Sequence, residues 1–176
     1  MSEIILHSPI GKEASFDPDI TPISTSRGGK VAFLFNGHVS VLPFWNNLES
    51  EIKSVLEPTE TMQIIKPNTF APASSEDIDS LSSADLAIVG LCAGGACTSG
   101  SVRDGINLER TGVPAIVISH NVFEKAARAQ CNALGVPDLR ILVYSQPKGE
   151  EEEVEGAKAA TDISKQLIQM IASEDK

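Results

Sequence analysis

Residues 86–101 have the sequence Leu86-Ala-Ile-Val-Gly-Leu-Cys-Ala-Gly-Gly-Ala-Cys-Thr-Ser-Gly-Ser101. The apolar run at the start is short and leads into a glycine-rich turn, which is typical of a buried strand. A helix is expected over about 101–110, since Gly112 follows as a stop signal. The segment therefore predicts a strand, a tight glycine turn and a helix, which together form the repeating unit of an α/β fold.

The same alternation extends through most of the chain. Apolar runs predict further strands over 31–35, 62–66, 114–118 and 139–143, and helical spacing predicts helices over about 44–56, 75–81, 123–134 and 151–172. Five short strands alternating with helices predict a mainly parallel sheet covered on both faces, a three-layer flavodoxin-like or Rossmann-like sandwich. Proline and glycine without a sustained period predict an extended N-terminal arm over 1–29, ahead of a single α/β domain over 30–176.

Composition limits the classes of function. The chain has 176 residues, of which 41% are apolar and 22% charged, as expected of one globular domain. Its net charge of −10 argues against nucleic acid, although residues 86–148 hold six basic and four acidic groups. Because no apolar stretch approaches the ~20 residues of a membrane helix, we expect a soluble, cytoplasmic protein with no membrane partner. The odd number of cysteines, Cys92, Cys97 and Cys131, predicts reduced thiols, with Cys131 serving only in packing.

The cysteine turn is the most informative segment for function. In open parallel sheets the ligand lies beyond the carboxyl ends of the strands. The backbone N–H groups of Gly94 and Gly95, together with the positive end of the following helix, predict an anion or oxyanion pocket there. A thiol in such a place ionises more readily, so we expect Cys97 to act as nucleophile or acid/base, with Cys92 as a candidate second thiol. The alternative is that both are small buried apolar residues.

Other candidate residues follow the predicted strands. His120 ends the fourth strand, next to the third, and is expected to exchange a proton with Cys97, while His38 holds the equivalent place after the first strand. The alternative for either histidine is that it serves only its loop. Asp104 is expected to favour the dipole of its helix. The glycine spacing matches no P-loop or dinucleotide fingerprint, so neither a metal nor an organic cofactor is expected. The residues expected to bind substrate are Asn36, Gly37, Gly94, Gly95, Thr98, Ser99, Ser101 and Asn121.

Four segments together resemble the UGSC family, which is named for a selenocysteine-or-cysteine, Gly, Ser, Cys motif followed by Thr-Ser. They are Phe35-Asn-Gly37, Gly95-Ala-Cys-Thr-Ser-Gly-Ser-Val-Arg-Asp104, Leu108-Glu-Arg-Thr-Gly-Val-Pro114 and Ala133-Leu-Gly-Val-Pro-Asp-Leu-Arg140. The resemblance covers roughly residues 30–172 and carries over Cys97. The family's first redox residue falls on Gly94 and its serine on Ala96, which implies a remodelled pocket with a different substrate or reaction.

Two more distant resemblances concern the same turn. One is to the selenoprotein B subunits of the glycine and proline reductases. The other links Ala96-Cys-Thr-Ser-Gly-Ser101 to the aspartate/glutamate racemase superfamily, where a cysteine acts as nucleophile or proton donor and nearby hydroxyls and N–H groups bind a carboxylate. Both resemblances imply a functional thiol at this position.

These observations predict a small-molecule enzyme of the lyase, isomerase or hydrolase type, acting through Cys97 on a small anionic or carbonyl-bearing substrate. We also expect a homo-oligomer. Two alternatives stay open at this point. The first is a redox protein in which Cys92 and Cys97 cycle between dithiol and disulfide. The second is a non-catalytic subunit of an oligomeric enzyme complex.

Overall fold

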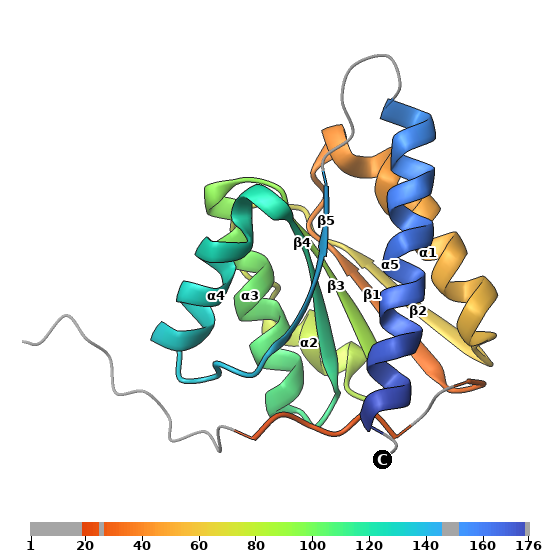
Figure 1. The fold of residues 1–176 in the computed structure, drawn as a ribbon. Helices are drawn as coiled ribbons and strands as arrows, with labels where there is room; N and C mark the ends of the chain where they lie inside the picture. The colour runs from red at the N-terminus through yellow and green to blue at the C-terminus, as the bar shows by residue number, and fades with distance from the viewer. Residues whose placement is uncertain (1–18, 25–26, 146–151, 175–176) are drawn as a thin grey trace, which may run out of the picture.

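The computed structural model describes residues 19–24, 27–145 and 152–174, which form an α/β sandwich around one five-stranded sheet (Figure 1). All neighbouring strands are parallel, and their order is β2-β1-β3-β4-β5. This order is that of flavodoxin-like folds, so the predicted fold class is confirmed. The strands are β1 (Lys30–Phe35), β2 (Glu60–Ile65), β3 (Leu86–Cys92), β4 (Ala115–His120) and β5 (Arg140–Tyr144).

Helices cover both faces of the sheet (Figure 1). Two lie on one face, α1 (Leu42–Leu56) and α5 (Glu152–Glu174), and three on the other, α2 (Ser75–Leu81), α3 (Gly95–Arg110) and α4 (Glu124–Ala133). Short 3₁₀ turns, η1 (Val39–Val41) and η2 (Asn121–Phe123), precede α1 and α4. A bilayer-spanning helix is absent from the part of the chain that the structure describes.

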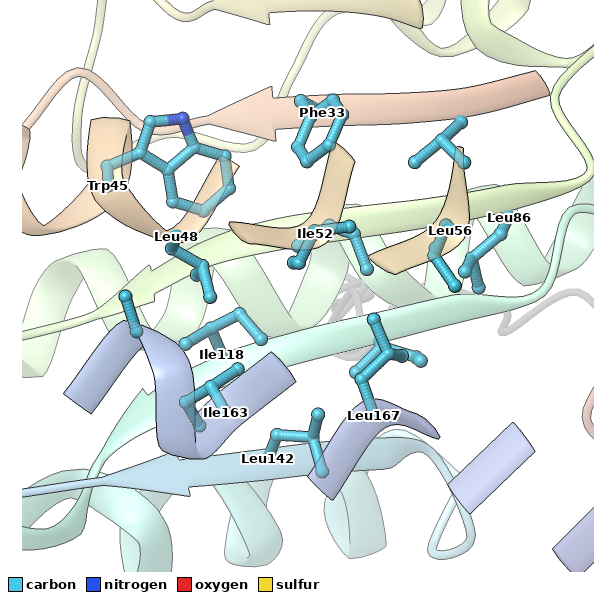
Figure 2. Close-up of a cluster of buried hydrophobic side chains, with 14 of the residues drawn as sticks. Phe33, Trp45, Leu48, Ile52, Leu56, Leu86, Ile118, Leu142, Ile163 and Leu167 are labelled. Carbon is cyan, nitrogen blue, oxygen red and sulfur yellow. The ribbon is translucent and has the colours of Figure 1, made fainter. Parts of the chain in front are cut away.

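The central strand β3 is buried along its whole length because it faces a hydrophobic core on each side. Leu86 and Ile88 belong to the cluster under α1 and α5, part of which is shown in Figure 2, and Val89 belongs to the cluster under α3. Gly90 is required at its position, since a Cβ atom there would lie 2.6 Å from the ring of Trp45. Close packing of Trp45 on the strand thus fixes α1 against the sheet.

One irregularity in β3 determines the direction of its last side chains. Gly90 pairs with Ile118, and Cys92 pairs with Ser119, so Leu91 is an extra residue relative to β4. As in a β-bulge, the alternation of side chains changes phase there. Leu91 consequently packs in the α1/α5 cluster and Cys92 in the cluster on the α3 side.

The first turn of α3 lies where the sequence predicted a loop. Most predicted elements agree with the structure to within two residues, but α3 begins at Gly95 instead of about residue 101. Glycine lowers helix propensity in an interior, which favoured a loop for this segment, but its effect is small in a first turn. Cys97 therefore lies inside the helix, and Asp104 lies in its middle part.

The outer edge of β5 is covered by side chains. Arg128 donates hydrogen bonds to the carbonyl oxygens of Leu139 (3.3 Å) and Ile141 (3.5 Å), and Gln166 donates to that of Val143 (3.5 Å). These groups would otherwise be open to pairing with another strand. The other edge strand, β2, has an alternation of exposed and half-buried residues.

A buried ion pair ties the lead-in segment to the sheet. Glu109 of α3 and Arg140 of β5 are 3.1 Å apart and almost fully buried. Glu109 also accepts from the backbone N–H groups of Thr21 (2.7 Å) and Ala115 (2.8 Å), and Arg140 donates to the carbonyl of Thr21 (2.9 Å). Ile23 follows into the core. The rest of the predicted arm, residues 1–18 and 25–26, lies outside the described residues.

We predict that Glu109→Ala destabilises the fold by about 3 kcal/mol or more, because it removes the carboxylate from a buried ion pair. It also deprives two backbone donors of their acceptor. Urea unfolding at neutral pH would measure the change, with Glu60→Ala as the matched control. Glu60 forms an exposed ion pair with Lys30 at 2.9 Å, and removing it should cost about 1 kcal/mol or less. Equal losses in the two variants would contradict the structural role of Glu109.

Candidate functional site

The strand order places the candidate site at the carboxyl ends of β1 and β3. The chain passes from β1 outward to β2 and then returns to β3 on the other side of β1, so the sheet has its topological switch point between β1 and β3. In such folds the loops on either side of the switch point separate and leave a crevice for a ligand. The loop after β1 begins with Asn36-Gly37-His38, and the loop after β3 leads through Gly94 into α3.

The N-terminus of α3 presents backbone donors to this edge. Gly94 is the N-cap residue and, having no side chain, supplies no capping hydrogen bond. The next two residues, Gly95 and Ala96, are exposed. Since the first N–H groups of a helix have no partner within it, those of Gly95, Ala96 and Cys97 depend on a ligand or water. The positive end of the helix dipole favours an anionic partner there.

Cys97 lies in this first turn with its thiol turned inward. The residue is 1% exposed, and its Sγ donates to the carbonyl oxygen of Gly94 at 3.2 Å. The same oxygen accepts from the backbone N–H of Thr98 at 3.0 Å and from its hydroxyl at 2.6 Å. Gly94 leaves space for the sulfur, because a Cβ atom at that position would lie 3.3 Å from Sγ. The carbonyl oxygen of Gly94 thus accepts three hydrogen bonds, and the one from the thiol is the weakest.

Cys92 lies close to Cys97 but has a different environment. It is fully buried and packs in the α3-side core. Burial, and to a smaller extent the nearby Cys97, raise the pKa of Cys92 to about 12, although hydrogen bonds with the hydroxyls of Thr98 and Ser119 oppose the shift. The thiol of Cys92 therefore stays protonated at neutral pH.

Tyr144 is a member of the site that the sequence analysis did not single out. Its ring stacks on Phe44 with centroids 4.2 Å apart and meets the His120 ring edge-on at 5.4 Å. Burial raises the pKa of Tyr144, and the charges of Cys92 and Cys97 raise it further. The phenol consequently stays protonated and can donate a hydrogen bond. It is the only tyrosine in the chain and ends β5 at the carboxyl edge, which is the signal that would have identified it.

His120 lies at the end of β4 on the α1/α5 side of the sheet, with Tyr144 beside it on β5. His120 is 3% exposed, and its Nδ1 accepts from the backbone N–H of Val122 at 3.1 Å. An Nδ1 that accepts carries no proton, so the neutral ring carries its proton on Nε2. Nε2 is buried and has no hydrogen-bond partner among the described residues. Burial lowers the pKa of His120, so the ring is neutral and its Nε2–H is a donor. This group forms no hydrogen bond with Cys97 or with any other described residue.

The predicted binding residues after β1 have internal partners. Asn36 is fully buried and donates to the carbonyl of Leu91 at 2.6 Å and toward the hydroxyl of Ser101 at 3.4 Å. Its amide oxygen accepts from the N–H of His38 at 3.2 Å. Gly37 has a φ of +75°, and a Cβ there would lie 2.7 Å from the carbonyl oxygen of Lys66. These residues bind β1, β3 and α3 together at the switch point.

The remaining predicted residues are spread around the thiols. His38 is half-exposed and its Nδ1 lies 2.7 Å from the hydroxyl of Ser40. Ser99 accepts from the side chain of Gln130 at 3.0 Å, which ties α3 to α4. Asn121 is exposed in η2. Of the residues predicted from sequence, the structure brings together Cys92, Gly94, Cys97 and Thr98, and it joins Asn36 to Ser101.

A buried ion pair supports α3 from the β2 side. Lys66, just after β2, donates to Asp104 of α3 and to the carbonyl of Ala71 at 2.7 Å, and Asp104 accepts from the N–H of Ala73 at 2.6 Å. Burial raises the pKa of Asp104, while Lys66 and Ala73 oppose the shift. Asp104 lies far from the helix start, so the expected dipole role is wrong. Its role is to hold the 71–73 loop against α3.

The stability of the protein should fall in mild acid because of His120. Its folded pKa is below the unfolded value of about 6.5, so the unfolded chain takes up the proton first as pH falls. The contribution is present above about pH 6.5 and is lost as pH falls through the folded pKa. His120→Asn keeps an acceptor for the N–H of Val122 but does not titrate, so its unfolding free energy should depend less on pH between 5 and 7. Urea titrations at several pH values would show this, and identical pH slopes would refute it.

Comparison with known proteins agrees with the resemblance noted in the sequence. The model of the UGSC family matches residues 5–173, which is nearly the whole chain. A search of curated proteins gives no match.

Proposed function

The chain belongs to the UGSC family, and we propose that it is a small-molecule enzyme in which Cys97 acts as nucleophile or acid/base. The proposed substrates carry a carboxylate or a carbonyl group. The reaction would be that of a lyase, isomerase or hydrolase, which needs proton transfer or a covalent thiol adduct but no organic cofactor. With three free thiols, we further propose a cytoplasmic location.

The observation that carries this proposal is the position of the Cys97 sulfur in the uncapped first turn of α3, at the switch point of the sheet. The positive end of the helix dipole lies at this turn and favours an anionic ligand beside the sulfur. The other two acidic groups nearby, Cys92 and Tyr144, are kept protonated by burial. Among these three groups, Cys97 is therefore the best candidate for the reacting group.

The surrounding donors suit an oxygen atom that gains negative charge. In the proposed complex the N–H groups of Gly95 and Ala96 bind a substrate carboxylate or carbonyl oxygen. The phenol of Tyr144 and the Nε2–H of His120 are further neutral donors at the same edge. Such a set stabilises developing charge without needing a side-chain cation.

Access to the sulfur requires a local change. Cys97 is almost fully buried, whereas Gly95 and Ala96 above it are exposed. In the proposal, ligand binding at the turn draws the sulfur away from the carbonyl of Gly94. The bond given up is a weak S–H···O contact, and the oxygen retains its two bonds from Thr98.

We predict that Cys97→Ala lowers turnover by at least about 100-fold, because it removes the group that transfers the proton or forms the adduct. Wild type and variant would be incubated in D₂O with a panel of small carboxylic and oxo acids. NMR would follow deuterium uptake next to the carboxyl or carbonyl carbon and the appearance of products. Cys92→Ala is the matched control and should retain activity, since Cys92 packs in the core.

A second variant tests the geometry of the turn. Gly94→Ala adds a methyl group 3.3 Å from the Cys97 sulfur without requiring an unusual backbone conformation. It should reduce turnover while the urea midpoint changes little. The proposal fails if Cys97→Ala retains the activity of the wild type, or if Cys92→Ala loses activity while Cys97→Ala does not.

The redox alternative rests on the closeness of the two thiols, since Cys97 contributes to the raised pKa of Cys92. Disulfide exchange needs a thiolate, and the pKa of about 12 keeps Cys92 protonated and unreactive. We therefore predict no crosslink between Cys92 and Cys97 after mild oxidation with diamide. Peptide mass spectrometry would detect the loss of two hydrogen atoms that a disulfide causes. Its appearance in the folded protein would favour the redox function over the one proposed above.

A further inference from the structure

A single buried amide, that of Asn36, contacts both ends of the segment that carries Cys97. The segment runs from Leu91, the extra residue at the end of β3, to Ser101 in the second turn of α3. The Nδ2 atom of Asn36 donates to the carbonyl oxygen of Leu91 at 2.6 Å and lies 3.4 Å from the hydroxyl oxygen of Ser101. Cys97 lies between these two points in the sequence, so the amide links the two chain ends of the cysteine turn.

The carbonyl group of Leu91 lies where the chain leaves the sheet. As the extra residue, Leu91 has no partner in the register between β3 and β4. Its carbonyl oxygen accepts instead from the amide of Asn36 and from the backbone N–H of Ala93, the latter at 3.0 Å. Together these two bonds turn the chain toward Gly94, the N-cap residue of α3. Without Asn36, only the bond from Ala93 would set this direction.

Asn36 is itself firmly held at the end of β1. Its backbone N–H donates to the carbonyl oxygen of Gly90 at 2.7 Å, and its Oδ1 accepts from the N–H of His38 at 3.2 Å. The amide has one possible orientation, because the carbonyl of Leu91 can only accept and the N–H of His38 can only donate. The side chain is 0% exposed, which leaves it no surface for a ligand. The position therefore uses an asparagine for its donor and its acceptor together.

We propose that Asn36 is a positioning residue for Cys97: it fixes the first turn of α3, so that the sulfur and the exposed N–H groups of that turn meet the substrate together. The inference rests on the proposed function, because positioning affects turnover only if Cys97 and those N–H groups act on the substrate. Its donor is the essential group, since an oxygen in place of Nδ2 would face the carbonyl oxygen of Leu91 with no proton between them. In this assignment Asn36 touches neither the substrate nor the sulfur.

The test compares two substitutions that keep the shape of the side chain. Asn36→Asp replaces the donor by a carboxylate oxygen, which the carbonyl of Leu91 repels. Asn68→Asp is the matched control, because it adds the same charge at a position that contributes an acceptor. The Oδ1 of Asn68 accepts from the N–H groups of Phe70 (3.0 Å) and Ala71 (3.3 Å), and a carboxylate accepts these bonds equally well.

Hydrogen–deuterium exchange of the full chain, followed by peptide mass spectrometry, would report on the cysteine turn directly. In Asn36→Asp, exchange in residues 91–101 should be faster than in the wild type by about tenfold or more, while exchange in β5 should change far less. Asn68→Asp should leave both segments as in the wild type. Equal acceleration in residues 91–101 and in β5 would show a general loss of stability and would contradict the positioning role.

Two measurements at the thiol separate positioning from folding. Iodoacetamide forms a carbon–sulfur bond with the thiolate as iodide leaves, and Asn36→Asp should speed this reaction at Cys97 by about threefold or more, because a looser turn exposes the buried sulfur. The same variant should lower kcat in the deuterium-uptake assay by about tenfold or more, because the sulfur and the N–H groups no longer share one geometry. A merely structural role would not make the thiol more reactive and the enzyme slower together.

A second variant keeps the proposal testable if Asn36→Asp does not fold. Ser101→Ala removes the contact at the α3 end without adding a charge, and it should speed exchange in residues 91–101 by about twofold or more. Wild-type exchange in this segment in every variant that folds would overturn the role of Asn36 and leave the proposed function intact. Activity that persists in Cys97→Ala would instead overturn the proposed function, whatever the exchange rates are.

Discussion

The extra residue at the end of β3 is the constraint on which the site depends. A regular strand would point Cys92 toward α1 and Leu91 toward α3. The register shift between Gly90 and Cys92 exchanges these directions, so the sulfur of Cys92 meets Thr98 and Ser119 while Leu91 completes the opposite core. Gly90 accompanies the shift because Trp45 occupies the space of its side chain.

Polar ties around the switch point then fix α3 relative to the sheet. Asn36 links the ends of β1 and β3 to Ser101, and the Lys66–Asp104 pair links β2 and the loop after it to the next turns of α3. Each tie is buried, and a buried polar group is stable only with its partners in place. The first turn of α3 has no side-chain cap, so its backbone N–H groups are available to a ligand at the end of a firmly held helix. A ligand-binding turn on a rigid support is a common arrangement for functional sites.

The fold was predictable from sequence because each strand is a short apolar run bounded by turn residues, and the strand positions agree closely with the structure. The start of α3 was not predictable, since glycine, alanine and cysteine give no signal that separates a loop from a first helical turn. Cys97 and Cys92 were found from their place after a strand. Their burial was not predictable, because it depends on the register shift and on packing between distant segments. The same limitation applies to Tyr144 and to the partner of Asp104, which lies 38 residues away in sequence.

The covered edge of β5 leaves β2 as the edge strand at which another strand could pair with the sheet. Arg128 and Gln166 donate to the carbonyl oxygens of Leu139, Ile141 and Val143, so these three acceptors are already used by the chain itself. At the opposite end β2 presents an exposed strand. Any continuation of the sheet into a second molecule would therefore start from β2, and a symmetric pair built in that way would place its two thiol turns at opposite sides of a shared ten-stranded sheet, separated by four strands or more.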